Sequence, residues 1–277
     1  MELKELAKEI ADVYMHNPKI ESVMLGGSVA RNLSDEFSDI ELFIFWRESP
    51  TDEDRKEPIE KLGGNILDFH PFEDEEWSET YTVQNVKLEI SNFLVSTAFQ
   101  YVESITLKYD TDLEKQVLLA SIDDGIPLGG EKALFELKGK IKLYPVKLGE
   151  AMVKENRELG TRWQNREALL AREDWLMLYQ IIVAVEVKLM GILFALNQRY
   201  VHHPAFKWQK ASLDNMEIKP ENSSERFASV LLGEPKESVK ELERLIIEVF
   251  QLAQTLYPEL DMSGAMEKAG WARPKNS

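Results

Sequence analysis

Two short stretches of the sequence combine residue types that could bind a phosphate group and a divalent metal ion. Residues 24–31 read MLGGSVAR and residues 38–45 read SDIELFIF. The two glycines let the backbone bend sharply, and a helix starting at Ser28 would present free N–H groups. Alternate side chains of a strand share a face, so Asp39 and Glu41 point the same way. Two adjacent carboxylates on an otherwise apolar strand favour a bound divalent cation. The two stretches therefore predict a phosphate site beside a metal site.

The order of these residues resembles the signature of the nucleotidyltransferase superfamily, which is Gly-Ser, a spacer and then Asp-x-(Asp/Glu). Here Gly27-Ser28 is followed, after the spacer, by Asp39-Ile40-Glu41. Within the superfamily the chain is most similar to the bacterial antibiotic nucleotidyltransferases, which act on aminoglycosides and lincosamides, and to their relatives. The specific motif covers only about residues 24–45. The resemblance implies that Ser28 holds a phosphate oxygen and that Gly27 allows the backbone to come close to it.

The same resemblance implies a site in which carboxylates on adjacent strands hold Mg²⁺. Asp39 and Glu41 would bind the ion that also contacts the triphosphate. A third acidic residue, from a neighbouring strand, would bind a second metal ion or act as the base. Glu89 and Asp68 compete for this role, because each lies between apolar residues in a strand-like segment. We favour Glu89, because the third acid of the family usually comes from the strand after the hairpin.

Cationic side chains for the triphosphate are expected in the second half of the chain. Residues 197–208 concentrate cations and aromatic residues in an otherwise acidic protein. In relatives, a helical domain supplies side chains to the triphosphate and the acceptor. By that resemblance Lys207 would neutralise the β- or γ-phosphate and Arg199 would assist it. The alternative is an ordinary junction between helices in which Arg199 caps a helix C-terminus.

The expected function is Mg²⁺-dependent transfer of a nucleoside monophosphate, with AMP from ATP as the favoured donor reaction. The acceptor would be a hydroxyl of a small polar or cationic molecule, with an antibiotic as the leading candidate, and pyrophosphate would be released. The acidic segment 73–77 and Glu79 could attract such an acceptor, or could be a solvated charge run. The alternatives are a protein or RNA acceptor, a non-catalytic nucleotide-binding or antitoxin-like module, and a helical interaction protein.

The composition limits the class of protein and its partners. The chain has 277 residues, of which 44% are hydrophobic and 30% charged, as in globular proteins. Its net charge of −16 disfavours nucleic acid as a partner. There are no cysteines, which excludes disulfides, thiolate metal sites and thiol nucleophiles. The start of the chain lacks the apolar core of a signal peptide, and polar residues interrupt the apolar run 175–196. We therefore expect a cytoplasmic protein without a membrane-spanning segment.

The elements that must position these residues indicate an α+β protein. Apolar alternation predicts strands at 20–25, 40–46 and 65–69, and a hairpin over 80–93 that turns at Asn85-Val86. Residues 72–79 are expected to form a loop. Helical periodicity dominates after residue 111 and is strongest at 174–198 and 236–256. We expect a nucleotidyltransferase-type catalytic domain of mixed sheet and helices over 1–110. A helical bundle that binds substrate or nucleotide is expected over 111–277, with apolar helices that could form a homodimer.

Overall fold

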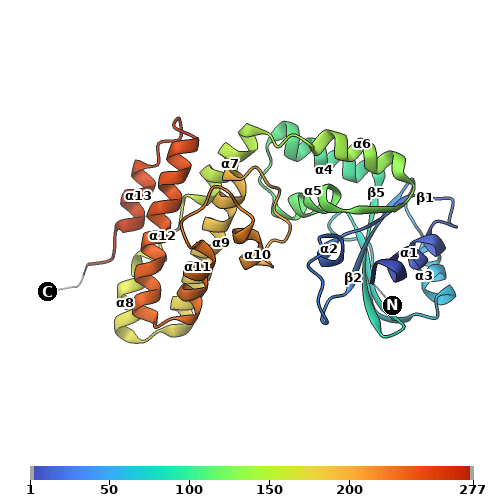
Figure 1. Cartoon of the computed structure of the whole chain (residues 1–277), viewed down its shortest axis with the longest axis horizontal. Helices are drawn as coiled ribbons and strands as arrows, with labels where there is room; N and C mark the ends of the chain where they lie inside the picture. The colour runs from blue at the N-terminus through green and yellow to red at the C-terminus, as the bar shows by residue number, and fades with distance from the viewer. Residues whose placement is uncertain (1–2, 275–277) are drawn as a thin grey trace. The chain divides into compact units, whose positions relative to one another are not determined.

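The chain folds into two compact units, each with its own architecture. The computed structural model describes residues 3–274. The first unit comprises residues 3–108 and 115–143, and the second comprises residues 109–114 and 144–274. Figure 1 shows that the sheet belongs to the N-terminal part of the chain and that the C-terminal part is helical. The expected α+β class, with a mixed sheet followed by a helical region, is confirmed.

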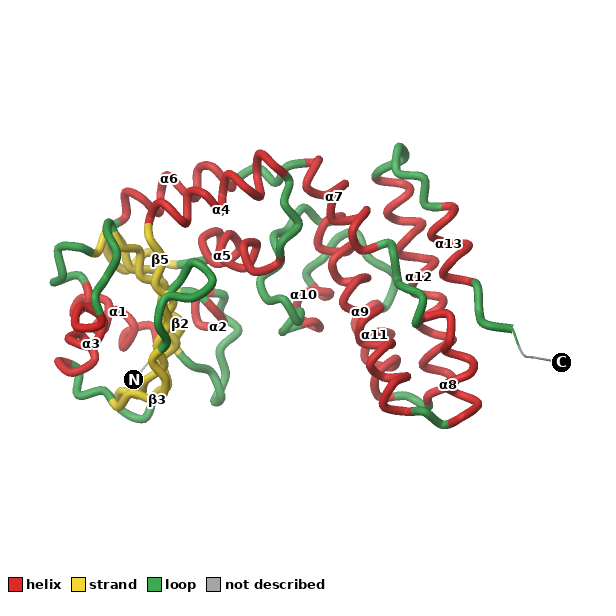
Figure 2. The backbone as a smooth tube through the Cα atoms, turned by 180° about the vertical axis from the view of Figure 1, so that it is seen from behind, coloured by secondary structure: helices red, strands yellow, loops and turns green. Residues whose placement is uncertain are grey.

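A six-stranded sheet forms the centre of the first unit, with its strands in the order β3-β4-β5-β2-β1-β6. Its strands, yellow in Figure 2, are β1 Ile20–Leu25, β2 Ile40–Trp46, β3 Asn65–Phe69, β4 Trp77–Val83, β5 Val86–Leu94 and β6 Ile126–Gly129. The central pair, β2 and β5, runs parallel, and every other neighbouring pair is antiparallel. The hairpin turn lies at Gln84-Asn85, one residue earlier than expected, and both of its residues have a positive φ angle.

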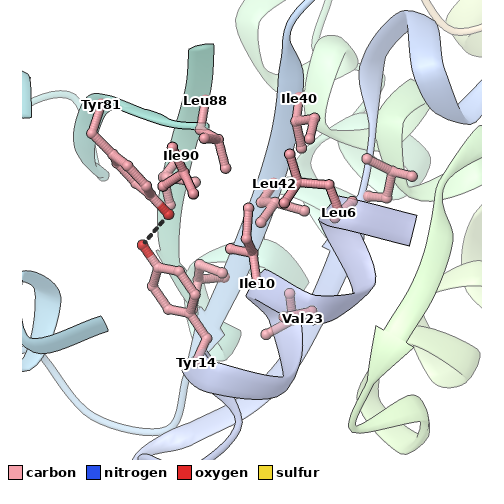
Figure 3. Close-up of a cluster of buried hydrophobic side chains, with 14 of the residues drawn as sticks. Leu6, Ile10, Tyr14, Val23, Ile40, Leu42, Tyr81, Leu88 and Ile90 are labelled. Atoms are coloured by element: carbon pink, nitrogen blue, oxygen red, sulfur yellow. Dashed lines mark hydrogen bonds between the residues drawn. The ribbon is translucent and has the colours of Figure 1, made fainter. Parts of the chain in front are cut away.

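One face of the sheet is buried beneath the first helix, α1 (Leu3–Tyr14). Apolar residues of α1 recur at three- and four-residue steps, so Leu6, Ile10 and Tyr14 share one side of the helix. Figure 3 shows these three side chains directed at alternate residues of the central strands, including Leu42 of β2. The Tyr14 hydroxyl lies 3.2 Å from that of Tyr81, which satisfies both buried polar atoms. Helix α3 (Asp52–Lys61) comes after β2 in the chain, and a capping box at Thr51 closes its N-terminus.

The opposite face of the sheet is only partly covered. Helix α4 (Val95–Lys108) places Tyr101 against Phe93 of β5, and Phe93 stacks on Phe43 of β2 with ring centroids 6.5 Å apart. Helices α5 (Leu113–Asp124) and α6 (Glu131–Ile141) complete this layer, with α6 packed against α4 and β1. The same face of β2 and β5 continues towards Asp39 and Glu89, where the side chains are polar. The apolar cover therefore ends beside the carboxylates.

The first unit extends beyond the boundary expected from the sequence at residue 110. The helical periodicity of the sequence stops after α5. The short segment that follows is the strand β6, which pairs antiparallel with β1. The Gly130 backbone lies so close to Glu21 that a Cβ atom there would stand 1.8 Å from the Glu21 carbonyl oxygen. A four-residue edge strand has too few residues to display an alternating pattern, so its position could not be predicted from periodicity. Residues 115–143 therefore complete the sheet and do not belong to the helical unit.

The segment 72–79 is not entirely a loop, because β4 begins at Trp77. Trp77 and Glu79 are buried, so they are neither an exposed aromatic platform nor part of an exposed acidic run. Glu79 accepts hydrogen bonds from Arg55 Nε at 2.9 Å and from Asn92 Nδ2 at 2.9 Å, and Asn92 in turn accepts one from Trp46. Burial raises the pKa of Glu79, whereas the Arg55 charge opposes that rise. Expectation and structure differ here because a buried ion pair leaves no apolar signature in the sequence.

The second unit is a helical bundle arranged around the helix α9. Its helices are α7 Val146–Asn156, the 3₁₀ turn Trp163–Asn165, α8 Arg166–Arg172, α9 Trp175–Leu196, α10 Gln209–Asp214, α11 Ser223–Leu232, α12 Pro235–Leu256 and α13 Ser263–Gly270. Helix α9 packs against α7, α11 and α12, as its apolar periodicity predicts. It is the one helix within residues 3–274 that is long and apolar enough to cross a membrane, yet 56% of its most apolar window is buried inside the protein, as in a core helix.

Glu186 of α9 provides a test of how the second unit tolerates charge. Its side chain is 4% exposed, Oε2 accepts a hydrogen bond from Gln209 at 3.2 Å, and Oε1 has no partner among the described residues. Burial raises the pKa of Glu186 from 4.5 to about 7. Because the folded-state pKa lies above that of the unfolded chain, ionisation destabilises the fold as the pH rises from 4.5 to 7.

We therefore expect Glu186→Gln to raise the free energy of unfolding at pH 8 by on the order of 3 kcal/mol, and at pH 5 by less than about 1 kcal/mol. Urea unfolding at the two pH values measures this difference. Glu167→Gln, at an exposed position of α8, is the matched control and should change little at either pH. An equal gain from Glu186→Gln at both pH values would contradict the raised pKa.

Candidate functional site

The Gly-Gly-Ser segment forms a tight turn between β1 and the one-turn helix α2 (Gly27–Ala30). Gly26 N donates to the Glu41 carbonyl oxygen at 2.9 Å, which ties the turn to β2. Gly27 has φ +65°, and a Cβ atom there would lie 2.3 Å from the Glu41 carboxyl carbon. Only glycine tolerates both the left-handed backbone and this close approach. The two halves of the sequence motif are therefore in direct contact.

Three of the expected site residues lie side by side on the partly covered face of the sheet. Asp39 immediately precedes β2, and Glu41 is its second residue. In the parallel pair of β2 and β5, Glu41 is in register with Glu89. Strand alternation places Asp39, Glu41 and Glu89 on the same face, with neighbouring strands about 4.8 Å apart. The structure thus brings together the carboxylates that the sequence singled out from two separate strands.

Asp68, the alternative third acid, lies farther along the sheet. It pairs with Thr80 of β4, and Thr80 pairs with Glu89 of β5. Asp68 is therefore two strand spacings from Glu89, roughly 9.5 Å, and one spacing more from Glu41. It is exposed on β3, one of the two edge strands of the sheet. Of the two candidates, Glu89 is the one adjacent to Glu41.

Lys87 adds a positive charge to this cluster. It lies two residues before Glu89 on the same face of β5, donates a hydrogen bond to Glu89 Oε1, and stands 3.4 Å from Asp39 Oδ2. The hydrogen bond to Glu89 and the nearby Asp39 carboxylate raise the pKa of Lys87. Lys87 was not among the site residues predicted from the sequence. The spacing Lys87-x-Glu89 could have indicated it, because this spacing puts both side chains on one face of a strand.

The carboxylate oxygens of this cluster are suitable ligands for Mg²⁺, although they do not form a complete metal site. Within residues 3–274, no group of three or more His, Cys, Asp or Glu side chains is close enough together to hold a metal ion. Mg²⁺ commonly uses one or two carboxylates together with substrate phosphates and not a complete protein cage. Asp39 and Glu41 offer oxygen ligands of that kind at neighbouring positions. The residues present therefore fit an ion that arrives with a phosphate-bearing ligand.

The expected phosphate-binding residues differ in their surroundings. Ser28 is only 5% exposed, within the turn. Arg31, which follows it, forms an ion pair with Asp124 at 3.0 Å. Arg199 and Lys207 are exposed residues of the second unit, whereas the carboxylates belong to the first. Arg199 donates to the carbonyl oxygen of Asn215, which caps α10, at 2.7 Å. This contact matches the helix-capping alternative, and it leaves the phosphate role of Arg199 and Lys207 as a prediction.

A domain family and a solved structure resemble this chain. Residues 111–209, which lie mostly in the second unit, match the model of a domain of unknown function (DUF4037). No curated protein matches the chain. Among solved structures, the chain is similar to a nucleotidyltransferase-like protein from Exiguobacterium sibiricum 255-15, with 14% identity and a TM-score of 0.42. The match covers 93% of this chain and 80% of that protein. Similarity at this level does not establish a shared activity.

Proposed function

We propose that the protein is a Mg²⁺-dependent nucleotidyltransferase whose active site lies on the first unit. The observation that carries the proposal is the in-register pairing of Glu41 with Glu89, beside Asp39 and against the Gly27 turn. A metal ion held by carboxylates can stabilise the charge of phosphoryl transfer, and a glycine turn lets the backbone approach a phosphate. This arrangement supplies both within one compact unit.

In the proposed reaction, the hydroxyl oxygen of the acceptor attacks the α-phosphorus of a nucleoside triphosphate, with ATP as the favoured donor. The bond from the α-phosphorus to the oxygen that bridges it to the β-phosphorus breaks, and pyrophosphate leaves. Bound Mg²⁺ would neutralise the negative charge of the transition state. Asp39 and Glu41 would hold that ion, while Glu89 would either share a second ion or receive the hydroxyl proton.

The proposed acceptor is a small polar or cationic molecule, and an antibiotic is one candidate. The net charge of −16 and the exposed acidic turn at Glu73, Asp74 and Glu75 support attraction of a cation. The same net charge weighs against an RNA acceptor, because phosphate binding relies on Lys and Arg. A protein acceptor remains an alternative with the same chemistry.

Calorimetric titration of each nucleoside triphosphate, with and without Mg²⁺, tests the proposal. We expect ATP to bind only with Mg²⁺, and Asp39→Asn to weaken that binding at least about tenfold, because the ion loses a charged ligand. Lys61→Gln, an exposed position on α3, serves as the control. Binding should be followed by a screen for pyrophosphate release with hydroxylated amines. Binding without release from any acceptor would favour a non-catalytic nucleotide-binding module, and no binding of any triphosphate would refute the proposal.

A further inference from the structure

One side of helix α9 remains open to solvent although most of its residues are apolar. Leu176, Gln180, Val183 and Val187 follow one another at steps of four, three and four residues, so their side chains share this side. Leu176 is 90% exposed, Val183 is 46% exposed and Val187 is half-buried. The core of the second unit takes up other positions of the helix, among them Leu178. We call the first four residues the α9 stripe.

The spacing of the α9 stripe is that of one helix of a coiled coil. Such helices contact each other through residues that alternate in steps of three and four. When two copies of one helix pair antiparallel about a twofold axis, Leu176 of one copy faces Val187 of the partner subunit. Gln180 then lies close to the axis, where a polar residue fixes the register of a pair. Met177, exposed beside the stripe, widens the apolar contact.

The charges at the two ends of the stripe favour this antiparallel arrangement. Glu173 and Asp174, both exposed, come just before the stripe, and Lys188 comes just after it. In an antiparallel pair the Lys188 of each copy lies beside the two carboxylates of the other, at both ends of the contact. A parallel pair would instead set like charges next to each other, which is unfavourable. The apolar pattern and the charge pattern thus fit the same partner, a second copy of the helix.

We propose that the α9 stripe is the contact surface of a homodimer, in which two copies of this chain pair their α9 helices antiparallel. One side of one helix makes an interface at the small end of the range for specific complexes, so the dimer should dissociate at micromolar concentrations. The dimer is independent of the proposed activity, because the carboxylates proposed for that activity belong to the first unit.

Sedimentation velocity of the full chain, from about 1 to 200 µM, tests the apolar part of the contact. We expect the native protein to shift from monomer to dimer over this range. Val183→Glu places a charge in the contact and should weaken the dimer at least about tenfold. Phe135→Glu is the matched control, because Phe135 is an exposed apolar residue of α6, outside the stripe, and should leave the dimer unchanged.

Exchanging the charges tests the antiparallel pairing. Lys188→Glu alone should weaken the dimer, because each end of the contact then holds only negative charges. Glu173→Lys combined with Asp174→Lys should also weaken it, although this change lowers the negative charge of the whole protein. Joining all three substitutions should restore the dimer to within about threefold of the native affinity, since opposite charges meet again. Thermal melting of each variant shows whether its fold is retained.

Several results would overturn the dimer or its geometry. A native protein that stays monomeric over the whole range would overturn it, including one that instead sediments with phosphatidylglycerol vesicles through this stripe. A dimer that Val183→Glu leaves intact would place the contact on another surface. Failure of the three joined substitutions to restore a dimer that Lys188→Glu weakens would overturn the antiparallel pairing.

Discussion

Glu41→Gln is expected to reduce nucleotidyl transfer by roughly 10²- to 10³-fold, the usual cost of removing one group that stabilises a transition state electrostatically. Glutamine has nearly the same shape as glutamate, so the side chain can still pack against Gly27, where the Glu41 carboxylate now lies. The loss would therefore come from the missing negative charge and not from a disturbed turn. Pyrophosphate release in the presence of ATP, Mg²⁺ and a hydroxylated acceptor measures the effect.

Asp68→Asn is the matched control for this prediction. Asp68 is another strand carboxylate of the same sheet, separated from Glu89 by β4. We expect its replacement to change the rate by less than about twofold, since water screens an exposed charge at that distance. A loss in Asp68→Asn as large as that in Glu41→Gln would make Asp68 the third carboxylate in place of Glu89. Full activity in Glu41→Gln would remove this face from the reaction.

Arg55→Met is expected to lower the free energy of unfolding by about 3–5 kcal/mol, because it leaves a buried carboxylate without its counter-ion. Arg55 and Glu79 are both fully buried as side chains, and Arg55 also donates to the carbonyl oxygens of His70 and Ser78. Its guanidinium group lies 4.0 Å from the centre of the Phe69 ring. Urea unfolding at neutral pH measures the change.

The dependence on pH and a second variant identify the cause of this loss. Without Arg55 the raised pKa of Glu79 would rise further, so the loss of stability should be smaller at pH 5 than at pH 8. Adding Glu79→Leu to Arg55→Met should recover much of the stability, since no buried charge remains. Lys56→Met, at the next position of α3, is the control and should cost less than about 1 kcal/mol. A loss that is independent of pH and is not recovered by Glu79→Leu would contradict the buried-pair account.

Glu41 and the buried pair of Arg55 with Glu79 belong to opposite faces of one sheet. Glu79 lies on the α1 side with Tyr81 and Asn92, where the sheet is closed, whereas Glu41 and Glu89 lie on the side that α4 only partly covers. The buried ion pair between Arg55 and Glu79 links α3 to β4, and β4 pairs antiparallel with β5. The buried side of the sheet thus ties together strands on which the spacing of the carboxylates depends.

The sequence by itself determined the elements that carry the candidate site. Strands β1 and β2 and the long helices α9 and α12 lie where their apolar residues predict them, because each buries those side chains, and the exposed edge strand β3 also lies at its expected position. The face shared by Asp39 and Glu41 also follows from the sequence, since strand alternation is local. For the same reason, the local need for glycine at position 27 could be inferred before the fold was known.

Only the tertiary structure decided which distant residues meet. Pairing of β2 with β5 places Glu89 and Lys87 beside Asp39 and Glu41, and strand register is a long-range property without a local sequence signal. The same holds for β6, a short edge strand added from residues far along the chain, and for Glu79, which is charged and yet buried because Arg55 reaches it. Charged side chains are usually exposed. A charged side chain can nevertheless be buried when folding brings an oppositely charged partner next to it.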